Sequence, residues 1–258
     1  MIIRPDRPHR LLALAAVFGC TLVGADCARA LVGGAPVATA EIARSVVGLV
    51  GPRNSFCTAT VITDDLLLTA GHCVQPGTSY SVQFKDANGV RQFSEVAATE
   101  RPPQFKAGPS GVSADLGLVK VVQPFPPNIG KVGVGLASPP VSPGDLVFVI
   151  GGGIPFRGLR ETGINRMALL IAAGRYLSPQ MLLIDPLGKG VGACFGDSGS
   201  PVFDIKNEDV KVIGVVSFAG SPDKTKRCGG LTGAIPLAPY HAWIEGTIKQ
   251  LEQRRRGR

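Results

Sequence analysis

His72, Asp115 and Ser198 are the residues of this chain whose types could together perform nucleophilic catalysis. A serine hydroxyl becomes a nucleophile when an imidazole lies within hydrogen-bond reach and a carboxylate holds the other ring nitrogen. The three residues lie far apart in the sequence, so only the fold could bring them together. The order His, Asp, Ser is one of several that known folds use for this geometry, and by itself it identifies no fold.

The residues around these three side chains are more specific. The histidine lies in T-A-G-H-C (69–73), the aspartate in D-L-G-L-V-K (115–120) and the serine in G-D-S-G-S-P (196–201). These segments resemble those of the trypsin-like (chymotrypsin-fold, S1 family) serine proteases. L-V-G-G at 31–34 is similar to the family's I-V-G-G mature start, and Y-x-x-W-I at 240–244 is similar to its C-terminal helix. The resemblance therefore spans nearly the whole chain after residue 30.

The resemblance implies a role for each matching residue. Ser198 would attack the scissile carbonyl, His72 would take its proton and return it to the leaving amine, and Asp115 would hold the imidazole tautomer. The backbone N–H groups of Gly196 and Ser198 would form the oxyanion hole. Cofactors and metal ions have no part in such a mechanism, and none is expected here.

Each of these residues also has an ordinary structural interpretation. Taken singly, Ser198 would be a turn serine, Asp115 a cap at a strand edge and His72 a buried histidine. Asp64 and Asp65 are alternative carboxylates for His72, but they precede the apolar run that leads to the histidine and are typical of a turn.

The first thirty residues have the features of a secretory signal peptide. A flank with three arginines precedes the apolar stretch 11–18, and Ala28-Arg29-Ala30 is a small-x-small cleavage site. The apolar stretch is shorter than the roughly 18 residues that a membrane-spanning helix needs. We therefore predict that the protein is secreted, to the cell exterior or a periplasm, and does not associate with a membrane after cleavage.

The resemblance gives Asp197 a partner at the mature N-terminus. In this family the corresponding carboxylate pairs with the free α-amine, here that of Leu31, and a buried carboxylate without a partner costs several kcal/mol. The cleavage site directly precedes Leu31. Signal cleavage alone would then release the active N-terminus, although cleavage after Ala25 followed by trimming is an alternative.

Composition and charge exclude several classes of protein. A chain that is 45% hydrophobic and 18% charged can bury a core, so disorder is excluded. Of the 27 basic residues, four Arg lie in the leader and four in the tail 252–258, so the folded body is close to neutral. We expect a solvated tail, no nucleic-acid partner and a monomer whose partners are protein or peptide substrates.

Four cysteines follow the leader, an even number that favours two disulfides in an oxidising compartment. Sequence alone allows three pairings. The resemblance implies that Cys57 pairs with Cys73 and Cys194 with Cys228, and each loop closure would contribute about 3 kcal/mol in the chain-entropy model.

Short apolar runs bounded by Gly, Pro, Asn or Asp recur along the chain and predict an all-β protein. A proline-rich stretch at 123–140 separates two halves of similar size. With the resemblance, the prediction is two six-stranded antiparallel β-barrels (chymotrypsin-like) with a C-terminal α-helix. The predicted divisions are the signal peptide 1–30, the N-terminal barrel 31–130, the C-terminal barrel 131–238, the helix 239–251 and the basic tail 252–258.

The resemblance also locates a primary specificity pocket. Its floor would be Gly192, where an enzyme that selects Lys or Arg has an Asp, and its walls would include Ser217, Phe218, Ala219 and Gly233. Such a pocket predicts cleavage after uncharged apolar residues, small to medium side chains first and aromatic ones second.

The interpretation is a secreted serine endopeptidase that acts through an acyl-enzyme intermediate. One alternative is a catalytically idle protease-fold protein that binds partners, but such relatives usually lose the histidine or the serine. Another is a serine esterase of a different fold, which requires G-x-S-x-G at a strand-to-helix turn with the serine before the histidine. The segment around Ser198 does not fit that pattern.

Overall fold

The structure of the chain is a computed structural model. The predicted signal peptide, residues 1–30, and the last two residues of the predicted tail lie outside the described residues. The structure describes residues 31–108, 111–136, 140–153, 165–175, 180–204, 210–223 and 228–256.

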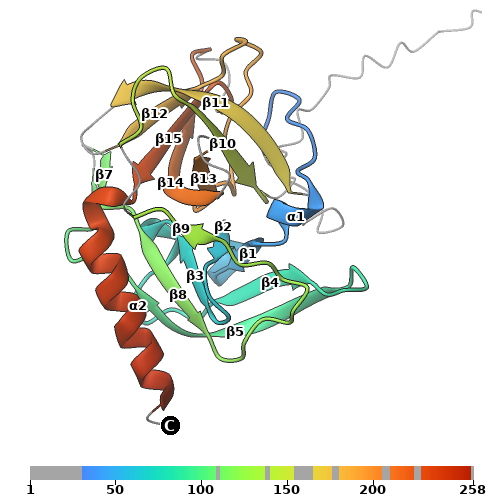
Figure 1. Ribbon diagram of the computed structural model, residues 1–258, viewed down its shortest axis with the longest axis vertical. Helices are drawn as coiled ribbons and strands as arrows, with labels where there is room; N and C mark the ends of the chain where they lie inside the picture. The colour runs from blue at the N-terminus through green and yellow to red at the C-terminus, as the bar shows by residue number, and fades with distance from the viewer. Residues whose placement is uncertain are drawn as a thin grey trace, which may run out of the picture.

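The first half of the chain forms a closed barrel of six antiparallel strands, coloured blue to green in Figure 1. Every residue of β3 and of β8 is buried, because these neighbouring strands face the barrel interior on one side and other parts of the protein on the other. In barrel order the strands are β1 (Val46–Val50), β2 (Phe56–Val61), β3 (Leu66–Thr69), β8 (Gly117–Val121), β5 (Arg91–Glu100) and β4 (Ser81–Lys85).

The second half forms another six-stranded barrel, closed by the pairing of β13 with β14, and β9 (Gly133–Val134) adds to it in parallel beside β14. The prediction of an all-β protein with two six-stranded barrels is therefore confirmed. The strands of this barrel are β13 (Pro201–Asp204), β10 (Leu146–Gly151), β11 (Arg166–Arg175), β12 (Met181–Ile184), β15 (Leu231–Pro236) and β14 (Lys211–Gly220).

The predicted C-terminal helix is present, with different bounds. A 3-10 turn at Ala238–Tyr240 leads into α2 (His241–Arg256), so the helix continues into the segment predicted as a solvated tail. Ile244 and Leu251 of this helix are fully buried, and α2 lies beside β8 of the first barrel (Figure 1). In the described part of the chain, no helix has the length and apolar character needed to cross a membrane.

The segment that begins at Leu31 and the C-terminal helix each pack on the barrel formed by the other half of the chain. Leu31 and Ala35, at the start of the predicted N-terminal barrel, are buried in the core of the C-terminal barrel, and Val32 pairs with Gly192. The short helix α1 (Ala40–Ala43) then leads into β1. A separate hairpin of β6 (Lys106–Gly108) and β7 (Gly111–Ser113) precedes the segment that contains Asp115. Leu31 and Ala35 thus pack on the second barrel, whereas α2 packs on the first.

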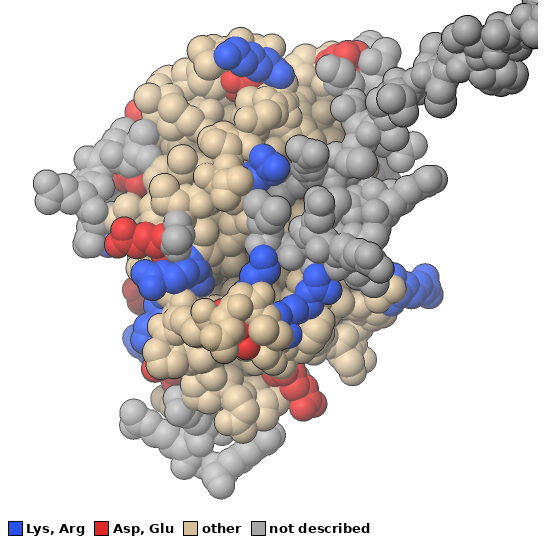
Figure 2. Space-filling view, turned by 90° about the vertical axis from the view of Figure 1, so that its right-hand side faces the viewer, with Lys and Arg blue, Asp and Glu red and all other residues tan. Residues whose placement is uncertain are grey.

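Charged side chains on one face of the molecule are mixed in sign. Figure 2 shows Lys and Arg side chains in a loose band across the middle of this face, with Asp and Glu side chains beside and around them. On the face that the figure shows, positive charge is not gathered into one broad surface.

Candidate active site

His72 and Asp115 are joined by two hydrogen bonds. The Nδ1 atom of His72 lies 2.8 Å from Oδ2 of Asp115, and the backbone N–H of His72 donates to Oδ1 at 2.7 Å. The Asp115 carboxylate is fully buried, whereas about a third of the His72 side chain is exposed. A buried carboxylate held at both oxygens fixes the imidazole so that Nε2 faces away from it.

A glycine and a disulfide place the histidine. His72 lies in a 3-10 turn, Gly71–Cys73, directly after β3, and Cys73 is bonded to Cys57 of β2. A Cβ at position 71 would meet the carbonyl oxygen of Leu116 at 2.7 Å. The glycine therefore allows the turn to approach the segment that carries Asp115.

The segment around Asp115 is unusual in its backbone. The preceding residue, Ala114, has a φ of 51°, which costs on the order of 1 kcal/mol for a residue with a Cβ. Behind the carboxylate, the Ser217 hydroxyl donates to Oδ2 at 2.5 Å. His72, Asp115 and Ser217 are thus connected across the two barrels, since Ser217 belongs to β14 and His72 follows β3.

Ser198 lies in a loop that two glycines shape. Gly196 and Gly199 both have a φ of 88°, a region that favours glycine. At position 199 a Cβ would also collide with the carbonyl oxygen of Thr58. The first barrel holds this loop, because the N–H of Thr58 donates to the carbonyl of Ser198 at 2.8 Å and the Thr58 hydroxyl donates to the carbonyl of Gly196 at 2.8 Å.

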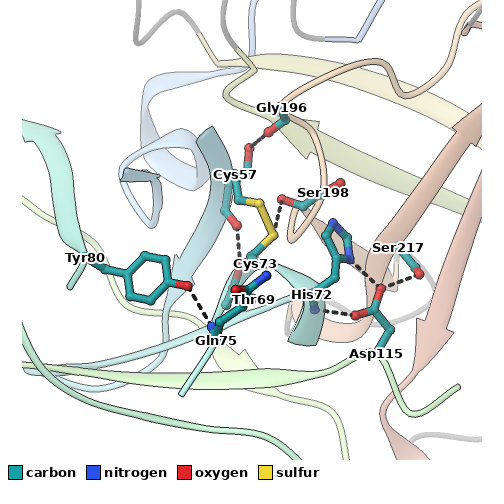
Figure 3. Close-up of a disulfide and its surroundings, with 11 residues drawn as sticks. Cys57, Thr69, His72, Cys73, Gln75, Tyr80, Asp115, Gly196, Ser198 and Ser217 are labelled. Atoms are coloured by element: carbon teal, nitrogen blue, oxygen red, sulfur yellow. Dashed lines mark hydrogen bonds and ion pairs between the residues drawn. A yellow bond between two sulfur atoms is a disulfide. The ribbon is translucent and has the colours of Figure 1, made fainter. Parts of the chain in front are cut away.

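His72, Ser198 and Gly196 line the same cavity, which has a volume of about 810 Å³. Figure 3 shows the imidazole of His72 between the Ser198 and Asp115 side chains. Among the described residues, no acceptor is recorded for the backbone N–H of Gly196 or of Ser198. These two donors at the cavity wall are therefore available to an oxygen atom of a ligand.

Asp197 points away from the cavity into the second barrel. It is fully buried, and its Oδ2 accepts hydrogen bonds from the backbone nitrogens of Leu31 and Cys194, both at 2.9 Å. Burial raises the pKa of Asp197 to about 6, although the N–H groups of Leu31, Cys194 and Gly153 act to lower it. The structure thus brings the predicted partners Asp197 and Leu31 together.

The alternative carboxylates are engaged elsewhere. Asp65 lies 2.6 Å from the Nζ of Lys120, and Asp64 lies 2.6 Å from the Nζ of Lys131. The carboxylate that contacts His72 is that of Asp115.

One group of described residues brings possible metal ligands together: Cys57, His72 and Cys73, whose ligand atoms lie within 4.8 Å of one another. Cysteine binds metals as a thiolate, and both sulfurs here are joined in a disulfide. The Nδ1 of His72 is bonded to Asp115. These donors do not suit a metal ion.

The second disulfide joins Cys194 to Cys228, so the bonded pairs are those that the resemblance implied. It ties the segment before Gly196 to the segment after β14, and both cysteines line the cavity. The disulfides therefore support the cavity from both barrels.

The residues of the predicted specificity pocket lie in different surroundings. Ala219 lines the cavity, whereas Ser217 is buried against Asp115. Phe218 pairs with Gly233 across β14 and β15, and its ring fills the space that a Cβ of Gly233 would occupy.

Gly192 is closely packed as well. A Cβ there would meet the nitrogen of Gly230 at 2.9 Å and the hydroxyl of Thr232 at 3.1 Å. The predicted floor therefore packs closely against Gly230 and Thr232, and neither Gly192 nor Gly233 lines the cavity beside Ser198.

Several cavity residues were not predicted from the sequence. Phe195 is 52% exposed, and Arg53 and Tyr80 lie on the side of the cavity toward the first barrel. An exposed aromatic next to Cys194 is a weak signal on its own, and Arg53 and Tyr80 belong to segments without a motif. Only the fold places them near Ser198.

Two barrels that meet at a bonded His-Asp pair and a serine loop define a chymotrypsin-fold protein of the serine protease class. The family model for trypsin matches residues 31–244 of the chain. The chain therefore belongs to the trypsin family, the trypsin-like (S1) serine proteases.

Three relatives illustrate the distance within the family. The chain is 26% identical to a brachyurin of Leptuca pugilator over 192 residues, which cover 67% of this chain and 82% of that protein. It is 24% identical to a trypsin of Sarcophaga bullata over 263 residues, covering 94% and 99% of the two chains. It is 23% identical to a lectizyme of Glossina austeni over 234 residues, covering 81% and 83%.

Proposed function

We propose that this protein is a secreted serine endopeptidase that cleaves peptide bonds after uncharged apolar residues. Ser198 attacks the scissile carbonyl while Nε2 of His72 accepts its proton. Asp115 stabilises the imidazolium that forms, since its Oδ2 already accepts a hydrogen bond from Nδ1. His72 then protonates the leaving amine, and water hydrolyses the acyl-enzyme by the same steps in reverse order.

The oxyanion forms beside Gly196. The backbone N–H groups of Gly196 and Ser198, for which no acceptor is recorded in the described part of the chain, are suited to bind the negative oxygen of the tetrahedral intermediate. A donor of this kind contributes about 3 to 4 kcal/mol to lowering the barrier, because it is aimed at charge that develops only in the transition state.

The observation that carries the proposal is the His72–Asp115 pair at 2.8 Å, with a fully buried carboxylate, on the wall of the cavity that Ser198 also lines. A fluorophosphonate probe tests it, because the probe labels only an activated serine. The wild type should be labelled and Ser198→Ala should not. Ser55→Ala, which alters another serine of the same cavity, should be labelled like the wild type. Absence of labelling in the wild type would favour the idle, partner-binding alternative.

Export and processing belong to the same proposal. Two disulfides are typical of proteins that fold in an oxidising compartment. The Leu31 nitrogen, 2.9 Å from Asp197, is a peptide N–H while Ala30 precedes it. Leu31 then has a φ of 41°, a strained value for leucine that exists only while the preceding peptide bond is intact. Cleavage before Leu31 would remove this strain and supply an α-ammonium to the buried carboxylate.

Processing should change how stability depends on pH. While Ala30 is attached, burial raises the pKa of Asp197 from 3.8 to about 6. A carboxyl group with a raised pKa stabilises the folded state at low pH, and this contribution is lost as the pH rises from about 4 through about 6. The loss should be about 3 kcal/mol. In the chain that begins at Leu31, the α-ammonium lowers the pKa of Asp197 and the loss should be much smaller.

Urea unfolding at pH 4 and pH 7 of chains that begin at Ala30 and at Leu31 measures this difference. Asp197→Asn in the longer chain removes the titrating group and should flatten its pH dependence over this window. Equal pH dependence of the two chains would contradict the proposed role of the N-terminus.

The proposed preference for small to medium apolar residues is supported by the packing around Phe218. By the resemblance, Gly192 forms the floor of the primary pocket and Gly233 lies in its walls, and the Phe218 ring covers Gly233. The ring reduces the depth available to a substrate side chain, and no Asp or Glu is present among the residues assigned to the pocket.

Removing this ring should favour larger substrates. Phe218→Ala is expected to raise the ratio of kcat/KM for peptides with Phe before the cleaved bond over peptides with Ala there by about tenfold, because the freed volume accepts the aromatic ring. Phe93→Ala, at an exposed phenylalanine of β5, serves as the control and should leave the ratio unchanged. A cleavage profile dominated by Lys or Arg would contradict the assignment of the pocket.

A further inference from the structure

The cavity extends well beyond the residues proposed to perform the chemistry. Its lining includes the β1–β2 turn, the Cys57–Cys73 disulfide and Tyr80, all from the first barrel. Figure 3 shows the disulfide between Tyr80 on one side and His72 with Ser198 on the other. This arm of the cavity therefore begins at His72 and runs past the disulfide toward the β1–β2 turn.

The position of this arm indicates which part of a substrate it would receive, the part before or the part after the cleaved bond. His72 delivers its proton to the leaving amine, so the leaving part of the substrate lies next to the imidazole. The disulfide adjoins the imidazole through Cys73, whereas Ser217 and Asp115 lie behind the ring. This step rests on the proposed function: in a serine protease, the arm past the disulfide receives the residues that follow the cleaved bond.

The arm has apolar walls and one fixed charge. Leu49, Phe56, Tyr80 and the disulfide provide apolar surface. Among the described residues that line the cavity, Arg53 alone carries a fixed charge, and no Asp or Glu lies among them. Arg53 is exposed, and within the described chain no hydrogen bond or ion pair of its guanidinium is recorded.

The turn that presents Arg53 is strained. The N–H of Ser55 donates to the carbonyl of Pro52 at 3.0 Å, and the two residues between them, Arg53 and Asn54, have φ values of 54° and 59°. Two positive φ values are those of a type I′ turn, which favours sequences such as Asn-Gly. Arginine is a poor residue for the first of these positions, so turn formation alone does not explain it.

We propose that Arg53 binds a carboxylate of the substrate on the leaving side of the cleaved bond and thereby selects substrates with negative charge there. A guanidinium pairs with a carboxylate through two parallel hydrogen bonds, and the apolar walls suit an uncharged residue between the cleaved bond and the acidic group. The carboxylate could be that of an Asp or Glu side chain or the C-terminus of a short peptide.

Matched peptides test the proposal and separate these sources. One pair has Glu or Gln as the second residue after the cleaved bond, both with amidated C-termini. A second pair has only neutral residues there and ends in a free or an amidated carboxyl group. We expect kcat/KM to be about tenfold higher for the Glu peptide than for the Gln peptide, with a smaller ratio at high salt because the pair is exposed. A preference confined to the second pair would assign Arg53 to the C-terminus.

Substitutions of Arg53 test whether the preference for Glu over Gln depends on its side chain. Arg53→Gln should bring the Glu/Gln ratio close to one, and Arg53→Lys should keep part of it. Arg53→Gly should also abolish the ratio while raising the thermal midpoint, because glycine suits the positive φ. Arg44→Gln removes an exposed arginine that does not line the cavity and should leave the ratio unchanged.

The outcomes distinguish this inference from the proposed function. The role of Arg53 would be overturned if the wild type cleaved the Glu and Gln peptides at equal rates, or if the Glu/Gln ratio of kcat/KM were unchanged in Arg53→Gln. In either case the serine protease assignment stands. Failure of the wild type to cleave any peptide, together with the absence of fluorophosphonate labelling, would overturn the assignment itself.

Discussion

Replacing Ser198 by alanine is expected to reduce kcat for peptide hydrolysis by about 10⁴-fold or more. The substitution removes the oxygen proposed to attack the substrate, and it leaves the loop intact because Thr58 holds Ser198 through its backbone carbonyl. The proposed oxyanion donors also remain, since they are backbone N–H groups. The residual rate should therefore come from these donors and from substrate binding.

The steady-state rate of cleavage of an apolar peptide substrate measures this loss. Absorbance sets the enzyme concentrations, and circular dichroism checks that each variant is folded. Ser55→Ala is the matched control, since Ser55 lines the same cavity and should retain nearly full activity. Retention of more than a tenth of the wild-type rate by Ser198→Ala would show that another group is the nucleophile.

Asp115→Asn should have the second-largest effect, a decrease in kcat of roughly 10⁴-fold. The asparagine oxygen can still accept the hydrogen bond from the His72 N–H, now made to Oδ1 at 2.7 Å. Its NH₂ group then replaces the oxygen that faces Nδ1. An N–H donor there forces the imidazole to carry its proton on Nε2, and in that tautomer the ring cannot accept the proton of Ser198.

The control for charge is Asp64→Asn, which removes an exposed carboxylate paired with Lys131 and should change kcat little.

Ser217→Ala provides an internal comparison. It deletes one hydrogen bond to Oδ2 and leaves both His72 contacts, so it should cost far less than Asp115→Asn. A larger effect of Ser217→Ala than of Asp115→Asn would contradict this account of the pair.

Local patterns in the sequence predicted most of the elements but missed some strands. The run from Leu66 to Thr69 is apolar and bounded by a turn, and it is β3. The apolar pattern does not indicate β5, because Arg91–Glu100 has no apolar alternation and no buried residue. It does not indicate β15 either, because Gly233 and Pro236 are unfavourable in strands, yet this strand belongs to the barrel wall, where β12 and β14 supply the pairing.

The family of the chain and the residues proposed for its chemistry can be predicted from local motifs. Short motifs around His72, Asp115 and Ser198 indicate the residue types and the family, because a turn that presents a catalytic side chain needs particular neighbours, such as the glycines at 196 and 199. Such requirements are local, so they can be read from a few adjacent letters.

Contacts between distant segments follow from the fold of the whole chain. The Ser217 hydroxyl donates to Asp115, the Phe218 ring covers Gly233, and Arg53 of the β1–β2 turn lines the same cavity as Ser198. Each of these contacts joins residues from different strands or barrels. Their partners are set by barrel closure and core packing, which depend on the whole chain and leave no pattern in any one segment.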